Sequence, residues 1–169
     1  MENTESGLLK PDTIKNRILT IRGVQVMIDR NLAELYGVET KRINEQVKRN
    51  PNRFPVRYCF QLTEKEKDEV VAICDHLSNL KFSYQLPYAF TEQGVAMLST
   101  ALKSDTAVKI SIQIIDSFVA MRRFLNENAA IFQRLDALES KQLETDGKFK
   151  QLFDSLQQVD FDTETGHFL

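Results

Sequence analysis

Cysteine, histidine and tryptophan are scarce in this chain of 169 residues, and their scarcity excludes several kinds of site. The two cysteines are Cys59 and Cys74, each inside an apolar segment, and tryptophan is absent. We interpret them as reduced, buried thiols, so neither a disulfide nor a metal site is predicted. His76 and His167 lie far apart in the sequence and form no closely spaced Cys/His ligand set. We therefore expect no metal and no other cofactor.

Long apolar runs are also lacking. The longest apolar stretch, residues 110–120, is interrupted by four polar residues. It falls short of the roughly 18 uninterrupted apolar residues that a membrane span requires. The first 13 residues are polar and acidic, unlike a secretory signal, which is basic and then apolar. These features predict a cytoplasmic protein without a membrane partner.

The chain has little net charge, −2 at pH 7, which by itself argues mildly against nucleic-acid binding. The distribution is more informative, because residues 40–58 hold six basic residues against the single acid Glu45. This segment carries +5 and leaves −7 for the rest of the chain. A focused positive patch on an acidic protein is typical of a surface that contacts phosphates. A solvated helix face would have the same composition, so both interpretations stay open here.

Hydrophobic periodicity and turn residues predict an α+β domain with a small antiparallel sheet. Strands are expected over residues 18–21, 24–28, 57–62 and 86–90, and the first two form a hairpin at Arg22-Gly23. Helices are expected over residues 30–36, 41–50, 63–77 and 91–102, and from residue 105 onward. The capping residues expected at helix starts are Asp29, Thr63 (in a capping box with Glu66), Thr91 and Ser104.

Residues 31–49 have the organisation helix, tight turn, helix. Ala33 lies where two helices must approach closely, and Gly37 permits a left-handed turn. Ile43 and Val47 form the inner stripe of the second helix. This is the spacing of a helix-turn-helix, whose second helix is held out for insertion into a major groove. Helical hairpins with Ala and Gly are common, however, so the spacing alone does not establish DNA binding.

The second helix and the segment after it carry the residues expected to contact duplex DNA. Basic side chains suit phosphates, whereas Arg, Asn and Gln match the edges of guanine and adenine. The candidates for phosphate contacts are Lys41, Arg42, Lys48, Arg49, Arg53 and Arg57. The candidates for base contacts are Arg42, Asn44 and Gln46, with Glu45 on the same helix. The alternative for Asn44 and Gln46 is that they are merely polar surface positions.

One stretch resembles the KilA-N superfamily, and most of all the branch named for the N-terminal domain of a phage open reading frame six product: RGVQVMIDRNLAELYGVETKRINEQVKRNPNRFP, residues 22–55. FQLTEKE at 60–66 and LPYAFTEQGVAMLS at 86–99 resemble later blocks of the same domain. The resemblance implies a DNA-binding domain of phage and prophage proteins, often fused to unrelated C-terminal modules. Residues 55–58 depart from the family pattern, which has an acidic pair there, and make this chain more basic.

Four segments are predicted along the chain: a flexible lead-in at 1–13, the domain at 14–125, a helical arm at 126–159 and a flexible tail at 160–169. Gly147 weakens the arm by about 1 kcal/mol relative to Ala, so the sequence allows a break or a hinge there. Nine positions of the arm follow alternating four- and three-residue steps, which is the pattern of a coiled-coil seam. They are Ile131, Leu135, Leu138, Gln142, Thr145, Phe149, Leu152, Leu156 and Val159.

The arm is expected to make the protein a homo-oligomer, most simply a homodimer whose two basic helices address two half-sites. The residues predicted to make this contact are Ile131, Leu135, Leu138, Phe149, Leu152 and Leu156. The alternative is an arm that folds back on its own domain as an ordinary amphipathic helix.

Together these features predict a phage- or prophage-type DNA-binding protein with a role in transcription regulation, associated with the bacterial nucleoid. No enzymatic activity is expected, because the glycines are scattered singly and form no phosphate-binding loop. Asp29, Glu39 and Lys41 formally match a nuclease pattern, but Gly37 places Glu39 in a turn rather than on a strand. The alternative function is that of an antirepressor, which captures a protein such as a phage repressor through its helical arm.

Overall fold

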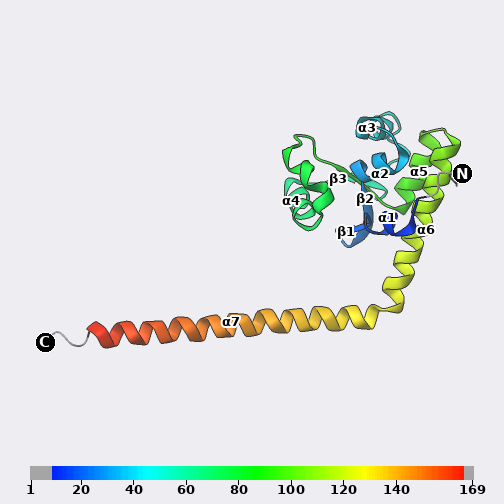
Figure 1. Ribbon diagram of the computed structural model, residues 1–169. Coiled ribbons are helices and arrows are strands. Elements are labelled where there is room, and N and C mark those ends of the chain that lie inside the picture. The colour runs from blue at the N-terminus through cyan, green and yellow to red at the C-terminus, as the bar shows by residue number, and fades with distance from the viewer. Residues whose placement is uncertain (1–8, 166–169) are drawn as a thin grey trace, which may run out of the picture. The chain divides into compact units, whose positions relative to one another are not determined.

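The computed structural model describes residues 9–165, and their side chains except at residue 153 and residues 155–165. The chain divides into two units, Met1–Arg122 and Arg123–Leu169. The first unit contains a four-stranded antiparallel sheet and most of the helices, and the second is helical (Figure 1). The predicted α+β class, with a long C-terminal helix after a small sheet, is therefore confirmed. No helix in residues 9–165 is long and apolar enough to cross a membrane.

The sheet has the strand order β1-β2-β4-β3, and all neighbouring strands are antiparallel. The strands are β1 (Leu19–Ile21), β2 (Val24–Ile28), β3 (Cys59–Gln61) and β4 (Tyr88–Phe90). The predicted hairpin between β1 and β2 is confirmed. Its two turn residues, Arg22 and Gly23, have φ angles of 55° and 72°, the positive values that a two-residue hairpin turn of type I′ requires.

The described helices are α1 (Pro11–Lys15), α2 (Asp29–Tyr36), α3 (Thr40–Arg49), α4 (Glu64–Ile73), the 3-10 helix η1 (Asp75–Phe82), α5 (Glu92–Ala101), α6 (Asp105–Glu127) and α7 (Ala129–Thr165). Three predicted helix starts are confirmed, because each capping hydroxyl accepts a hydrogen bond from a backbone N–H three residues on. The capping residues are Thr63, Thr91 and Ser104. At Thr63 the Glu66 carboxylate also accepts from the Thr63 backbone N–H, which completes the capping box.

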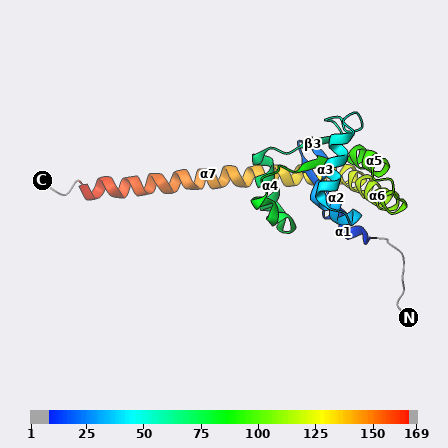
Figure 2. The same ribbon diagram turned by 90° about the horizontal axis from the view of Figure 1, so that it is seen from above.

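Both faces of the sheet are buried, so the sheet separates two hydrophobic clusters. Met27, Cys59 and Phe90 belong to the larger cluster, to which α2, α5 and α6 contribute. Ile28 and Ala89, their neighbours in the strands, belong to the smaller cluster with residues of α4 and η1. This division follows from the alternation of side chains along a strand. In both views α4 lies on one side of the sheet and α5 and α6 on the other (Figures 1 and 2).

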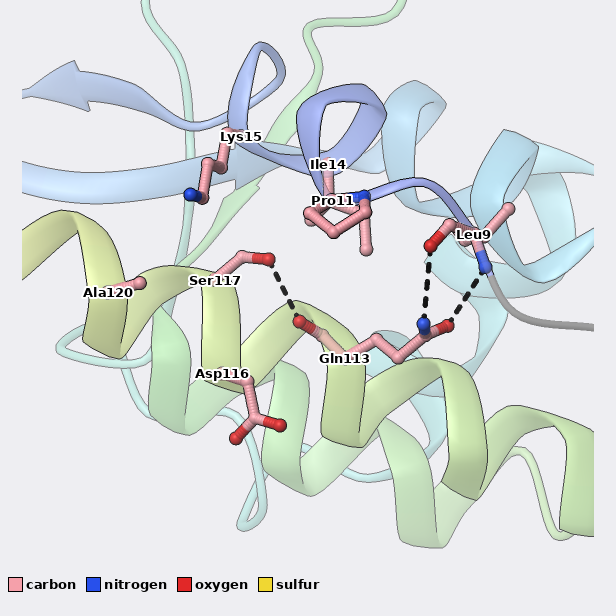
Figure 3. Close-up of a pocket in the computed structure, with 8 residues that line it drawn as sticks. All are labelled: Leu9, Pro11, Ile14, Lys15, Gln113, Asp116, Ser117 and Ala120. Atoms are coloured by element: carbon pink, nitrogen blue, oxygen red, sulfur yellow. Dashed lines mark hydrogen bonds between the residues drawn. The ribbon is translucent and has the colours of Figure 1, made fainter.

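Residues 9–13 were predicted to belong to a flexible lead-in. In the structure they are held against α6. Pro11 begins α1, where its fixed φ and missing N–H suit the first helical position. Ile14 is buried in the larger cluster. The backbone N–H of Leu9 donates to the Gln113 side chain at 3.2 Å, and its carbonyl accepts from that side chain at 3.3 Å (Figure 3). Residues 1–8 of the predicted lead-in lie outside the described residues.

Two local features between residues 28 and 85 differ from the prediction. Asp29 is the first residue of α2 rather than its N-cap, which is Ile28. The predicted helix to residue 77 ends at Ile73, and most of the predicted loop at 78–85 is part of η1. Leu77 and Leu80, three residues apart, are both buried in the smaller cluster. A 3-10 helix has three residues per turn and brings both leucines to the same side.

The break in the C-terminal helices lies at Asn128 and not at Gly147. The Asn128 side-chain amide donates to the Phe124 carbonyl at 2.9 Å, and the Asn128 backbone N–H donates to the same carbonyl at 3.1 Å. Gly147 lies inside α7, so the break that the sequence allows there is not present. α7 also extends to Thr165, past the predicted end of the arm at residue 159, and residues 166–169 are outside the described part.

Replacement of Gly37 and of Gly147 by Ala should have opposite effects. An added Cβ would meet nothing within 4 Å at either position, but only Gly37 has a positive φ, +67°. Gly37→Ala should destabilise the domain by about 1 kcal/mol because of left-handed strain, measured by urea unfolding. Gly147→Ala should stabilise α7 by about 1 kcal/mol, seen as a higher melting temperature of its helical circular dichroism. Equal effects of the two changes would contradict this account.

The ion pair between Arg22 and Glu66 should make stability depend on pH in the acid range. The guanidinium of Arg22 donates to both carboxylate oxygens of Glu66, at 2.9 and 2.8 Å. This ion pair, together with hydrogen bonding to Thr63, lowers the pKa of Glu66 to about 2. The stabilisation is present above the unfolded-state pKa of about 4.3 and is lost as the pH falls toward 2.

We expect Glu66→Gln to lower the urea midpoint at pH 6 and to have progressively less effect between pH 4.5 and pH 2.5. Asp68→Asn, an exposed change on the same helix, is the matched control. A Glu66→Gln effect that is the same at both ends of this pH range would exclude the ion pair as its cause.

Candidate nucleic-acid interface

A left-handed turn at Gly37 joins α2 to α3. The Gly37 N–H donates to the Glu34 carbonyl at 3.2 Å, and the Val38 N–H donates to the Ala33 carbonyl at 2.9 Å. These two bonds form a Schellman motif, which ends α2 and reverses the chain. Ala33 and Ile43 are both buried, so the two helices pack closely. The predicted helix-turn-helix-like pair is present.

The buried carboxylate of Asp29 connects α2, β4 and α3. It accepts hydrogen bonds from the backbone N–H groups of Arg30 at 2.7 Å and Tyr88 at 3.1 Å. The side chain of Asn44, on α3, is its third partner. Burial raises the pKa of Asp29 above its usual range, and these hydrogen bonds oppose that shift. A single acidic group thus holds the inner side of α3 to the sheet.

The assignment of Asn44 to base contacts is corrected by its burial. Its side chain is 7% exposed and is bonded to Asp29, so it does not reach the surface of α3. Positions 40, 43, 44 and 47 are spaced as i, i+3, i+4 and i+7, which places Asn44 on the inner face with Ile43. This spacing could have revealed the burial from the sequence, but polar residues at two of the four positions, Thr40 and Asn44, obscured the pattern.

The outer side of α3 carries the predicted cations. Lys41, Arg42, Lys48 and Arg49 are exposed, and we call these four residues the basic face. Glu45 and Gln46 are half-buried. Glu45 is three or four residues from each of the four cations, so it lies in the middle of the basic face. No member of the basic face forms a salt bridge in the described part of the chain.

The two remaining predicted cations, Arg53 and Arg57, follow α3 and are also exposed. Arg53 donates to the Thr100 hydroxyl at 3.2 Å. The Arg57 guanidinium lies 5.0 Å from the centre of the Tyr58 ring. Phe54, between these two arginines, is buried and packs edge-to-face on Phe90 with 6.1 Å between ring centres. We call residues 51–58 the exit segment.

The end of the exit segment is fixed to the start of α5. The Tyr58 carbonyl accepts from the backbone N–H of Thr91 at 2.9 Å and from its hydroxyl at 3.1 Å. Gly94 allows this approach, because a Cβ there would lie 2.3 Å from the Tyr58 carbonyl oxygen. The sequence did not identify Thr91 and Gly94 as supports of the exit segment, because more than thirty residues of chain separate them from Tyr58.

The described residues contain no group of three or more His, Cys, Asp or Glu side chains that could hold a metal ion. Both cysteines are free and buried, as predicted. Burial raises the pKa of Cys59 to about 12. The Cys59 thiol is therefore neutral at physiological pH and is a poor nucleophile.

This fold and this site define a class of protein domain. It is an α+β domain whose small sheet supports a helix-turn-helix-like pair with a basic second helix. The sequence profile of the ORF6N domain matches residues 16–101, just over half of the 169 residues. The chain therefore belongs to the ORF6N domain family, a phage-type domain, and the predicted resemblance is confirmed. The match ends at the last residue of α5, so α6 and α7 lie outside it. No curated protein and no solved structure matches the chain.

Gly94→Ala should displace the exit segment. The new methyl group would overlap the Tyr58 carbonyl, a backbone atom that cannot rotate away, and such overpacking costs about 1–3 kcal/mol. We expect a lower urea midpoint by that amount. Gln93→Ala, an exposed change at the preceding position, is the matched control and should leave the midpoint nearly unchanged. A Gly94→Ala midpoint equal to that of Gln93→Ala would show that this close approach is not needed.

Proposed function

We propose that this protein binds duplex DNA through α3 and the exit segment, and that it serves a regulatory role of the phage or prophage type. The observation that carries the proposal is the set of exposed cations on α3 and just after it, none of which forms a salt bridge with any side chain that the structure describes. They are Lys41, Arg42, Lys48, Arg49, Arg53 and Arg57. Cations without acidic partners are free to replace the counterions of a phosphate backbone.

The support beneath α3 favours this function over a merely solvated helix. A helix that enters a major groove must keep its orientation while its outer side chains contact the bases. Ile43 is fully buried, and Asn44 is bonded to the Asp29 carboxylate, so the inner side of α3 has both apolar and polar anchors. The protein acts, on this proposal, by binding rather than by catalysis.

Glu45 is the residue of α3 whose position suggests base contact most directly. An acid surrounded by four cations repels phosphates and therefore weakens nonspecific binding. A carboxylate in a groove can instead accept a hydrogen bond from the amino group of cytosine. Because Asn44 is buried, Arg42 and Gln46 remain from the predicted candidates for base contacts, and Glu45 is added to them.

The double variant Lys41→Glu/Arg42→Glu should lose DNA binding without unfolding. It reverses half of the basic face at exposed positions, and each lost phosphate contact weakens binding while each new acid repels the duplex. We expect at least about a hundred-fold loss of affinity in gel retardation at 0.1 M salt, or roughly 3 kcal/mol. The urea midpoint should change little.

The matched control is Lys65→Glu/Lys150→Glu, which makes the same change in net charge at exposed positions on α4 and α7. We expect it to retain most of the affinity. If the control lost as much affinity as the Lys41/Arg42 variant, binding would depend on total charge and not on α3. Unchanged binding by the Lys41/Arg42 variant would exclude α3 as the contact.

A second candidate function, capture of a protein such as a repressor, rests on α7. Its apolar side chains Ile131, Leu135 and Leu138 are each more than half exposed. An exposed amphipathic helix can lie in a hydrophobic groove of a partner. On this alternative, Leu135→Ser/Leu138→Ser would abolish capture of the protein partner, and Lys41→Glu/Arg42→Glu would preserve it. If DNA binding is the function, Lys41→Glu/Arg42→Glu should lose DNA affinity and Leu135→Ser/Leu138→Ser should retain it. Both variants are compared at the same protein concentration, above the dissociation constant of the dimer.

A further inference from the structure

α7 carries an exposed apolar stripe along one side. Its members within the described side chains follow alternating four- and three-residue steps, and each apolar one is more than half exposed. We call them the seam: Ile131, Leu135, Leu138, Gln142, Thr145, Phe149 and Leu152. Leu156 and Val159 continue the spacing, but their side chains lie outside the described ones. In heptad terms Leu135, Gln142 and Phe149 occupy positions a, and the other four occupy positions d.

The residues that flank the seam have opposite charges on its two sides. The g positions, each just before an a residue, hold Arg134, Lys141 and Lys148. Two of the e positions, each just after a d residue, hold Glu139 and Asp146. All five side chains are exposed. One edge of the seam is therefore entirely basic within this range, and the charged residues on the other edge are acidic.

We propose that α7 pairs with α7 of a second copy of this chain as a parallel, in-register coiled coil. In a parallel pair the g residue of one helix faces the e residue of the next heptad on the other helix. Arg134 then faces Glu139 of the partner subunit, and Lys141 faces Asp146 of the partner subunit. An antiparallel pair would instead place g against g and e against e. Base would then oppose base and acid would oppose acid, so the charges select the parallel orientation.

The polar position Gln142 selects the register. In register, its amide meets the same amide of the partner subunit, and the two can exchange hydrogen bonds. A shift of one heptad would bury Gln142 against Leu135 or Phe149, where the amide finds no partner and incurs a desolvation penalty. A single buried polar residue at an a position fixes register in coiled coils in the same way.

The orientation has a consequence for the first unit of the chain. Parallel helices bring both copies of residue 131 to the same end of the coiled coil. Antiparallel helices would separate them by the length of the seam, about 32 Å at 1.5 Å per residue. Because the first unit precedes Arg123 in the chain, parallel pairing joins both of its copies to the same end of the coiled coil, which suits a DNA site with two half-sites. Only this consequence rests on the proposed function; the pairing itself does not.

Disulfide trapping in the full-length chain tests the orientation. Ile131→Cys and Leu152→Cys introduce thiols at the two ends of the seam, and Leu143→Cys introduces one at an exposed position off the seam. A disulfide forms only when the two Cβ atoms approach to about 4 Å. The unmodified chain, whose two cysteines are buried, serves as the blank. In an antiparallel pair a d residue faces an a residue, so mixtures of Ile131→Cys with size-tagged Phe149→Cys, and of Leu135→Cys with size-tagged Leu152→Cys, detect antiparallel pairs.

Parallel pairing predicts nearly complete disulfide dimers for Ile131→Cys alone and for Leu152→Cys alone, little for Leu143→Cys, and few mixed dimers. Mixed dimers in excess of both self-pairs would overturn the parallel orientation. A chain that sediments as a monomer and forms no disulfide at either seam position would overturn the pairing altogether. Either result leaves the proposed DNA contact of α3 untouched, because no DNA is present.

Charge reversal provides a second readout that does not depend on introduced thiols. Glu139→Lys/Asp146→Lys should weaken dimerisation about ten-fold, because all four facing pairs become repulsive. Adding Arg134→Glu/Lys141→Glu to the same chain should restore the dimer, because the pairs are again of opposite charge. An antiparallel pair would be equally repulsive in all three chains, so equal affinities would contradict the proposal.

Discussion

The carboxylate of Asp29 is the group on which the arrangement of the domain depends most. It lies where β2 passes into α2, and it is 3% exposed. From there it accepts hydrogen bonds from β4 at Tyr88 and from α3 at Asn44. An acidic group in such a site is tolerated because its hydrogen bonds offset the cost of burial. The consequence is geometric: the sheet, the first helix of the pair and the second helix are tied at one point.

This tie determines which side of α3 faces outward. With Ile43 and Asn44 held inside, the remaining face of the helix presents Lys41, Arg42, Lys48 and Arg49 to solvent. The exit segment is held in turn by Phe54 on Phe90 and by the Tyr58 carbonyl at the start of α5. A chain with a net charge of only −2 can therefore display a rigid positive surface, because its cations are concentrated on one supported element.

Features specified by a few neighbouring residues could be predicted from the sequence. They include the Arg22-Gly23 hairpin, the caps at Thr63, Thr91 and Ser104, and the end of α2 at Gly37. What could not be predicted depends on contacts distant in sequence, such as Leu9 with Gln113 and Tyr88 with Asp29. These contacts order the segment before α1 and hold the Asp29 carboxylate against β4. The sequence therefore identified the cations that the structure exposes on and after α3, but it assigned Asn44 to the wrong side of the helix.

The central claim, that α3 and the exit segment dock on phosphates, is tested most directly by the salt dependence of DNA affinity. Labelled mixed-sequence duplex DNA is titrated with the full chain at several salt concentrations. With roughly four to six phosphate contacts per subunit, log affinity should fall with log salt at a slope of about −4 to −5. A slope near zero, or no binding at low salt, would mean that these cations form only a solvated helix face and would contradict the account.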